Sequence, residues 1–80
     1  MKDKIINLIK ENLIEIIPEL EGTTVMSDVS LVDLGANSID RAELITVTLE
    51  RLQLDISRVE FATANSIEDI ATLIEKKLPA

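Results

Sequence analysis

Ser38 is the residue of this chain whose type and position could serve chemistry. It lies in the run DLGANSIDRAE (residues 33–43), where a turn containing Gly35 leads into an acidic, amphipathic helix. The chain has no histidine and no cysteine, so Ser38 has no imidazole to activate its hydroxyl and no neighbouring thiol. A serine that is so prominent and so poorly equipped as a nucleophile is better explained as a point of attachment for another group.

The sequence also lacks the residue patterns of other kinds of catalytic site. The nucleophile-elbow pattern Gly-x-Ser-x-Gly and a glycine-rich phosphate loop are both absent from the sequence. Only oxygen ligands remain for a metal ion, and no EF-hand loop is present. Two carboxylates could act as acid and base, but nothing in the pattern forms a cleft that would hold a substrate between them. We therefore predict that the chain is not an enzyme and binds no metal.

A serine at a helix start also has an ordinary structural explanation, because serine is a favoured N-cap. Two neighbouring features favour attachment instead. Gly35 can adopt the positive φ of a tight turn, and the free N–H groups of a helix N-terminus suit a phosphodiester. Asp40, Glu43 and Glu50 would then present an acidic surface to a basic modifying enzyme.

The charge of the chain is negative and concentrated in its middle. The formal net charge is −7 at pH 7, and residues 21–56 hold seven acidic against two basic side chains. This charge argues against binding to nucleic acid or to an anionic membrane, and it favours partners with basic patches. No apolar run approaches the roughly 20 residues of a membrane span, and no signal peptide is visible. We expect a soluble, cytoplasmic monomer.

Composition predicts the fold class. Eighty residues suffice for one domain, residues 1–80, near the lower size limit for an unaided core. The hydrophobic fraction of 46% is almost wholly aliphatic, with Phe61 the only aromatic residue. Because apolar stripes on several helices can close such a core, we predict an all-α fold.

The first helix is expected over residues 2–17, ended by Pro18. Its buried stripe should consist of Ile6, Ile9, Leu13 and Ile16 or Ile17, and its wet side of Lys10, Glu11, Asn12 and Glu15. Residues 18–37 show no sustained period and predict a long connection, in which a short helical turn near Leu31 can form. The residues expected to pin this connection to the core are Val25, Met26, Val29, Leu31 and Leu34.

The second helix is expected over residues 38–52, and a short helix over residues 57–62 follows. The core stripe of the second helix should be Ala42, Ile45, Leu49 and Leu52, and its outward side Ile39, Glu43, Thr46, Val47 and Glu50. The last helix should begin after Ser66 as N-cap, with Asp69 completing a weak capping box, and should stop before Pro79.

Length, charge, helix order and the position of the serine together resemble the acyl carrier proteins over essentially the whole chain. Their attachment motif Asp-x-Gly-x-Asp-Ser-Leu is matched here by DLGANSI, residues 33–39. The resemblance implies a four-helix bundle of acyl-carrier type, with three longer helices, one short helix and a long first loop. It also implies that a phosphopantetheinyl transferase attaches phosphopantetheine to Ser38, and that the thiol of this arm carries acyl groups as thioesters.

Three positions depart from the usual pattern of that family. Asn37 replaces the common Asp before the serine, Thr46 stands where a larger apolar residue is usual, and Arg41 introduces positive charge. Arg41 has two interpretations that the sequence leaves open. It is either a solvated residue that pairs with Asp40 or Glu43, or a residue that selects partners.

The same run, together with Val59-Glu60-Phe61-Ala62, resembles the stand-alone donor carriers of polyketide β-branching cassettes. The resemblance implies an acetyl cargo made from malonyl, with an acyltransferase and a decarboxylating ketosynthase as loading partners and an HMG-CoA-synthase-like enzyme as acceptor. The partner-docking residues it suggests are Ile39, Asp40, Arg41, Glu43, Val47, Glu50 and Phe61. For Phe61, simple core filling is the competing interpretation.

Three alternatives remain at this point. Within the same class, the chain could be a general carrier for fatty-acid or polyketide synthesis, whereas its acidity and single domain argue against a carrier of amino acids. From another class, it could be an unmodified helical adaptor whose acidic face binds a basic partner. A small hydrolase has only the serine in its favour.

Overall fold

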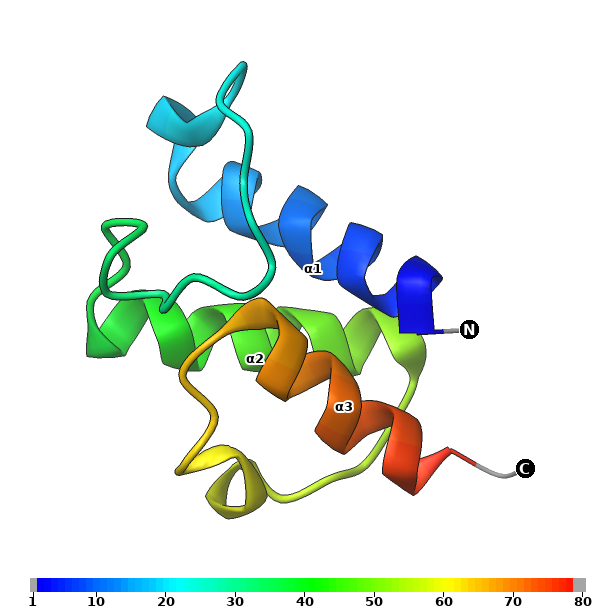
Figure 1. Ribbon diagram of the computed structural model, residues 1–80. Coiled ribbons are helices and arrows are strands. Elements are labelled where there is room, and N and C mark those ends of the chain that lie inside the picture. Colours follow the sequence, from blue (N-terminus) through cyan, green and yellow to red (C-terminus); the bar gives the residue numbers. More distant parts are fainter. Residues whose placement is uncertain (1, 79–80) are drawn as a thin grey trace.

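The computed structural model describes residues 2–78. The elements are α1 (Lys2–Ile16), η1 (Pro18–Leu20), α2 (Ser38–Leu52), η2 (Arg58–Phe61) and α3 (Ile67–Lys77), where η denotes a 3-10 helix (Figure 1). Among residues 2–78, the only β pairing is one isolated antiparallel bridge between Ser30 and Ser66. The all-α prediction is confirmed, with three longer helices and one short helix before the last.

Local signals set the helix ends. α1 stops one residue earlier than predicted, and Pro18 opens η1 because its fixed φ suits a first helical position. We did not predict η1, which lies inside the expected connection. The hydroxyl of Ser66 caps α3 by accepting from the Asp69 N–H at 3.1 Å, but the Asp69 carboxylate accepts from the N–H of Asn65 rather than from the cap residue. α3 ends at Lys77, and Pro79 lies outside the described residues.

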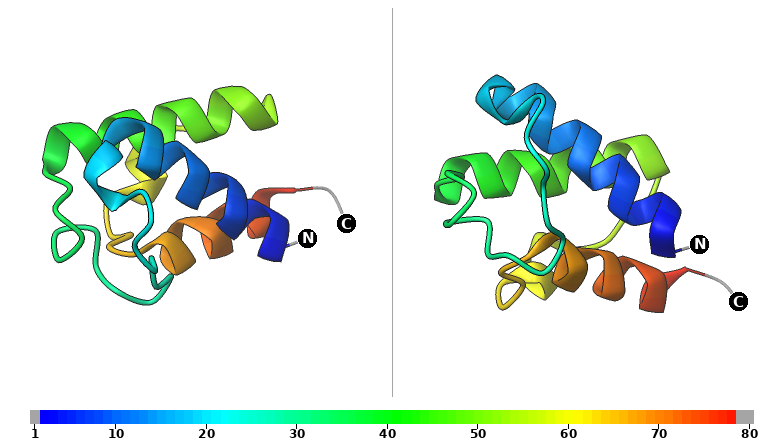
Figure 2. Two further views of the ribbon diagram at one scale, coloured as in Figure 1. Left: turned by 90° about the horizontal axis from the view of Figure 1, so that it is seen from above. Right: turned by 45° about the horizontal axis from the view of Figure 1, so that its top comes forward.

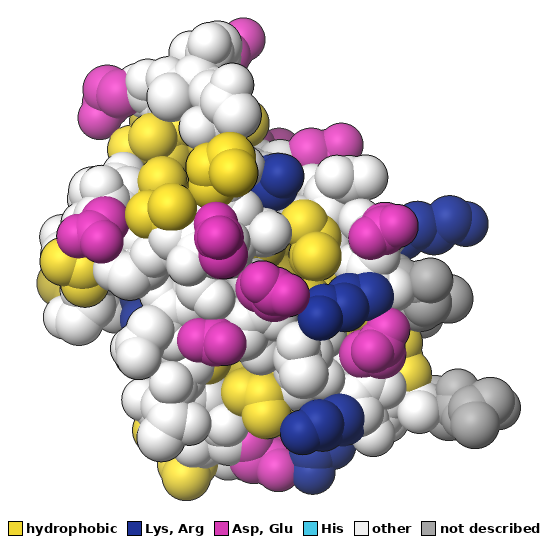
Figure 3. Space-filling model, viewed as in Figure 1, with side chains coloured by type: hydrophobic (Ala, Val, Ile, Leu, Met, Phe, Trp, Pro, Cys, Tyr) yellow, Lys and Arg dark blue, Asp and Glu magenta, His cyan; other side chains and the backbone are white. Residues whose placement is uncertain are grey.

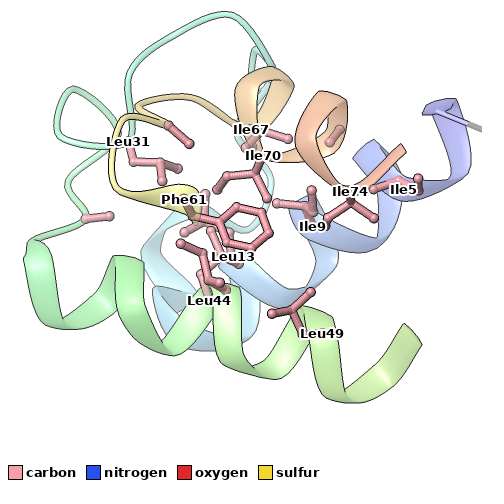
Figure 4. Close-up of a cluster of buried hydrophobic side chains, with 14 of the residues drawn as sticks. Ile5, Ile9, Leu13, Leu31, Leu44, Leu49, Phe61, Ile67, Ile70 and Ile74 are labelled. Atoms are coloured by element: carbon pink, nitrogen blue, oxygen red, sulfur yellow. The ribbon is translucent and has the colours of Figure 1, made fainter. Parts of the chain in front are cut away.

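The three α-helices enclose one aliphatic core around a single aromatic ring. α1 packs against both α2 and α3, while η2 contacts α2 on one side and α3 on the other (Figures 1 and 2). Phe61 of η2 is 1% exposed, and its ring lies in the centre of the buried cluster between Leu13, Leu44 and Ile70 (Figure 4). η2 therefore completes the core between α2 and α3 through one large side chain.

The buried face of α1 differs in part from the prediction. Ile9 and Leu13 are buried as expected, but Ile5 takes the place assigned to Ile6, which is only partly buried. Asn12, expected on the wet side, is fully buried. Its side-chain amide donates a 2.9 Å hydrogen bond to the hydroxyl of Thr48 on α2, so the polar group is paired inside the core.

The buried face of α2 is rotated relative to the predicted stripe. Ile45 and Leu49 are buried as expected, but Leu44 and Thr48 are buried as well, and Ala42 is exposed. α2 turns this way because its 44–48 edge meets α1, where the Asn12–Thr48 bond forms. Leu52 is partly buried against the core.

The long connection is attached to the start of α3. The N–H of Leu31 donates to the carbonyl oxygen of Asn65 at 2.7 Å, and the N–H of Glu68 donates to that of Ser27 at 2.9 Å. Val25 and Leu31 are buried and Leu34 packs against the core, as predicted, and Val29 is half-buried. Met26 was wrongly assigned to the core, since 52% of it is exposed. The connection is therefore ordered by specific bonds.

The start of α2 lies at the opposite end of the molecule from the start of α1 and the end of α3. All views show this arrangement (Figures 1 and 2). The residues at the start of α2 therefore lie far from both ends of the described chain.

Candidate functional site

A closed turn delivers the chain to the start of α2. The N–H of Ala36 donates to the carbonyl oxygen of Leu31 at 2.9 Å, and the N–H of Gly35 donates to that of Val32 at 3.0 Å. These two bonds form a Schellman motif, which requires a left-handed residue at the position of Gly35. Gly35 has a φ of +96°, as predicted, and both Leu31 and Ala36 are buried. The turn is thus anchored in the core at both of its ends.

Asn37, and not Ser38, caps α2. Its side-chain oxygen accepts from the N–H of Asp40 at 2.8 Å, and its own N–H donates to the Asp40 carboxylate at 3.3 Å, which together form a capping box. This arrangement argues against the structural explanation of Ser38 as a cap. It also explains the departure at Asn37, because Asn and Asp are equally good caps.

Ser38 is the first helical residue of α2, and it is exposed. Among residues 2–78 its hydroxyl makes no hydrogen bond. The N–H groups of Ser38 and Ile39 belong to the first turn, where a helix has no carbonyl partners for them. An exposed hydroxyl beside free N–H donors and the positive end of the helix dipole suits a covalently attached phosphate.

Three of the predicted docking residues follow Ser38 along the exposed side of α2. Ile39 is 75% exposed, and Glu43 and Glu50 are exposed at positions four and eleven residues further on. Figure 3 shows the face on which α1 and α3 lie in front of α2, and there acidic side chains are interspersed with basic ones. Val47 and Asp40 are half-buried, and the Asp40 carboxylate is engaged by the capping box.

The structure places two other predicted docking residues away from the open surface. Phe61 lies in the core, so core filling is its role and its side chain offers no surface to a partner. Arg41 is half-buried and, among the described residues, forms no ion pair with Asp40 or Glu43. It donates from Nε to the carbonyl oxygen of Ala64 at 3.0 Å and from Nη2 to that of Phe61. Of the two interpretations left open for Arg41, pairing with a neighbouring acid is therefore not what the structure shows, because the guanidinium bonds to backbone carbonyls instead.

Two residues of η2 that were not among the predicted docking residues lie beside α2: Arg58, and Val59, which was named only as part of the run 59–62. Arg58 of η2 donates to the hydroxyl of Thr46 at 3.2 Å, and the same hydroxyl donates to the carbonyl oxygen of Ala42 at 2.9 Å. Val59 of η2 is 79% exposed. The only signal in the sequence was Thr46 itself, a polar residue at a position where the resemblance implies an apolar one.

A shallow depression lies between α2 and the segment that leads to η2. Its volume is about 260 Å³. Its lining residues are Thr46, Leu49, Glu50, Leu54, Ile56 and Arg58. Its lining thus combines three apolar side chains with one hydroxyl, one acidic and one basic side chain.

Within residues 2–78, no group of three or more acidic, histidine or cysteine side chains is arranged to hold a metal ion. In the same range, no helix has the length and apolar character to cross a bilayer.

Comparison with known proteins agrees with the site. Residues 5–74 match the family described as phosphopantetheine attachment site. The chain is 39% identical over 77 residues to the polyketide biosynthesis acyl-carrier-protein AcpK of Bacillus subtilis (strain 168), covering 96% of this chain and 94% of that protein. It is 32% identical over 78 residues to the chloroplastic acyl carrier protein 3 of Hordeum vulgare, covering 98% of this chain and 56% of that protein.

A solved structure matches as well. One chain in the crystal structure of the curacin biosynthetic pathway HMG synthase in complex with acetyl donor-ACP superimposes with a TM-score of 0.91 and is 39% identical. The match covers 96% of this chain and 99% of that one. The predicted fold, the prosthetic group and the prediction that the chain is not an enzyme are therefore confirmed at the level of the family. The chain belongs to the acyl carrier proteins, which are carriers rather than enzymes and whose prosthetic group is phosphopantetheine.

Proposed function

We propose that Ser38 is the residue that carries phosphopantetheine. The proposal rests on one observation about two adjacent residues. Asn37 caps the helix, and the hydroxyl of Ser38 is therefore left exposed and is not used as a cap. A phosphopantetheinyl transferase would join the Ser38 oxygen to the phosphorus of the phosphopantetheine half of coenzyme A. The adenosine bisphosphate would leave, and the hydroxyl proton would pass to a base of the transferase, because this chain has no histidine.

The attached group supplies a thiol, which this cysteine-free chain lacks, and this thiol carries acyl groups as thioesters. The protein contributes a rigid point of attachment. The Schellman turn and the capping box hold the backbone on both sides of Ser38, and the buried Ala36 anchors it two residues earlier. The position of the arm relative to α2 is thereby defined for every partner that docks there.

We further propose that the cargo is acetyl and that the acceptor is an HMG-CoA-synthase-like enzyme of polyketide β-branching. The 39% identity to a polyketide carrier and to a carrier bound to an HMG synthase supports this assignment. An acyltransferase would load malonyl and a decarboxylating ketosynthase would convert it to acetyl. The protein would act as a monomer, as a single carrier domain over residues 1–80, in the cytoplasm.

The surface of α2 is consistent with a specific acceptor. Ile39 offers an exposed apolar contact beside Ser38, and Glu43 and Glu50 offer acidic ones. Arg58, which donates to the hydroxyl of Thr46, adds a positive charge to the depression that Glu50 also lines. A mixed pattern of this kind discriminates against partners that present only basic side chains.

The mass of the protein tests the attachment. Co-expression with a broad-specificity phosphopantetheinyl transferase should add the mass of one phosphopantetheine, and Ser38→Ala should prevent the addition. Ser57→Ala, which removes another exposed serine that precedes a short helix, serves as the matched control and should remain modifiable. An unchanged wild-type mass in the presence of active transferase would refute the proposal.

The acceptor needs a separate experiment. The acetyl-loaded protein should be turned over by a β-branching synthase faster than an acetyl-loaded fatty-acid carrier. Equal turnover would remove the donor assignment and leave a general acyl carrier, a second candidate that the match to the barley protein supports. A general carrier should instead accept long acyl chains readily from fatty-acid enzymes.

A further inference from the structure

Residues 61–65, the last residue of η2 and the start of the connection to α3, are bonded to the chain on both sides of Ser38. After Ser38, Arg41 donates to the carbonyl oxygens of Ala64 and Phe61. Before Ser38, the N–H of Leu31 donates to the carbonyl oxygen of Asn65 at 2.7 Å. One short segment thus contacts the approach to Ser38 and the helix that follows it.

The contact made by Arg41 is well suited to hold this segment. A guanidinium presents its N–H groups in a rigid fork, and hydrogen bonds from a charged donor are stronger than neutral ones. Both acceptors are backbone carbonyls of residues whose side chains are buried, Phe61 and Ala64, so the acceptors are themselves fixed. Arg41 lies three residues before the buried Leu44, at the N-terminal end of the core face of α2.

The contact made by Leu31 fixes the other side. Leu31 is the first residue of the Schellman turn, whose last residue is the buried Ala36. Ser38 follows Leu31 by seven positions and precedes Arg41 by three. The eleven residues 31–41 and the segment 61–65 therefore form a ring of covalent and hydrogen bonds that includes the exposed Ser38.

We propose that Arg41 is a positioning residue for Ser38, an inference that rests on the proposed attachment there. Arg41 holds residues 61–65 against α2, and this segment holds the turn that presents Ser38 to the transferase. Arg41 does not need to touch coenzyme A. Replacing Arg41 leaves the capping box of Asn37 intact, but residues 61–65 are then no longer held against α2. The turn before Ser38, which bonds to that segment, becomes less ordered, and the transferase must bind a less ordered surface.

A direct contact between Arg41 and a partner is the competing explanation, and it makes a different prediction. A docking contact would affect binding of the transferase without changing the free carrier. A positioning contact changes the free carrier, because the Leu31 N–H exchanges with solvent only when its bond to Asn65 opens. Hydrogen exchange of the unmodified protein therefore separates the two.

Arg41→Gln and Arg41→Lys are the test variants, and Arg51→Gln is the matched control. Arg51 also lies on α2 and also bonds to another element, through Asn12 and through Glu15 at 2.8 Å, but it is at the end of the helix remote from Ser38. Two quantities are measured for each variant. They are the exchange rate of the Leu31 amide in the unmodified protein, and kcat and KM for the carrier in the reaction of a phosphopantetheinyl transferase with coenzyme A.

Arg41→Gln should raise both the Leu31 exchange rate and KM by about tenfold, with kcat changed less than about twofold. Arg41→Lys should recover part of each effect, because an ammonium can reach a single carbonyl but cannot reproduce the fork. Arg51→Gln should lower the melting temperature and leave both quantities within about twofold of wild type.

Two results would overturn the inference. One is an unchanged Leu31 exchange rate in Arg41→Gln, which would show that Arg41 does not hold the turn. The other is an equal rise of KM in Arg51→Gln, which would reduce the effect to general destabilisation. A wild-type protein that the transferase never modifies would defeat the attachment proposal instead, and the exchange rate would still show whether Arg41 holds the turn.

Discussion

The side-chain amide of Asn12 donates a 2.9 Å hydrogen bond to the hydroxyl of Thr48, and both residues are completely buried between α1 and α2. The bond is part of a chain of polar contacts that leads to solvent. Arg51 donates to the side-chain oxygen of Asn12 and forms an ion pair with Glu15 at 2.8 Å. An unpaired polar group in the core would destabilise the protein. This series of polar contacts therefore favours the alignment of α1 against α2 in which every member is paired.

Thr48→Val should therefore destabilise the protein although it only exchanges a hydroxyl for a methyl group. The Asn12 amide would lose its acceptor inside the core, and the expected loss of unfolding free energy is about 1–3 kcal/mol. Urea denaturation followed by circular dichroism measures this difference. Thr72→Val, at a half-buried threonine on α3, is the control and should change stability by less than about 0.5 kcal/mol. Equal stability of Thr48→Val and wild type would show that the buried bond does not contribute.

Gly35→Ala should impair attachment at Ser38 as well as stability. The φ of Gly35 is +96°, and an added Cβ would meet no atom within 4 Å, so the penalty comes from the backbone and amounts to about 1–2 kcal/mol. Gly22→Ala carries a similar penalty at a φ of +82° and is the matched control. Only Gly35→Ala should lower kcat/KM of the transferase. Similar kinetics for both variants would mean that the turn before Ser38 does not position it.

Ile39→Ala should weaken the partner interaction without weakening the fold. Ile39 is 75% exposed, so its truncation should change unfolding free energy by less than about 0.5 kcal/mol. As the apolar residue beside Ser38, it is expected to be central to the docking surface, and turnover by the HMG-CoA-synthase-like enzyme should fall roughly tenfold. Val32→Ala removes an equally exposed apolar residue outside α2 and should leave turnover unchanged. Parallel losses in both variants would contradict docking on α2.

Salt should slow the transferase reaction through Glu43 and Glu50. These exposed carboxylates attract a basic partner over a range that ions screen, so kcat/KM should fall as sodium chloride is raised. The double variant Glu43→Gln, Glu50→Gln should start from a lower kcat/KM and show a flatter salt dependence. Glu21→Gln, Glu75→Gln removes the same charge from exposed sites elsewhere and should retain the wild-type slope. If both double variants showed the same dependence of kcat/KM on salt, the net charge of the protein, and not Glu43 and Glu50, would explain the attraction.

The elements and the turn that leads to Ser38 were predictable because their signals are local. Helical periodicity located α2 over residues 38–52 and α1 to within one residue, and Gly35 indicated the turn before Ser38. A positive φ, a cap and an amphipathic period depend on residues a few positions apart, so they can be recognised without knowledge of the fold. The interpretation of Ser38 as a point of attachment rests on composition, since a chain without histidine or cysteine leaves Ser38 without a catalytic partner, whereas phosphopantetheine was implied by the resemblance to acyl carrier proteins.

The partners of individual polar side chains were decided only by the tertiary structure. Asn12 was expected in solvent and is buried because Thr48, 36 positions away, meets it across the helix interface. For Arg41 the sequence left open a pairing with neighbouring acids or a role in partner selection, but the side chain bonds to the carbonyl oxygens of Phe61 and Ala64, twenty and twenty-three positions away. A long side chain bonds to whatever the packed chain brings beside it. That proximity depends on how α1, η2 and α3 pack against α2, which no local pattern in the sequence records.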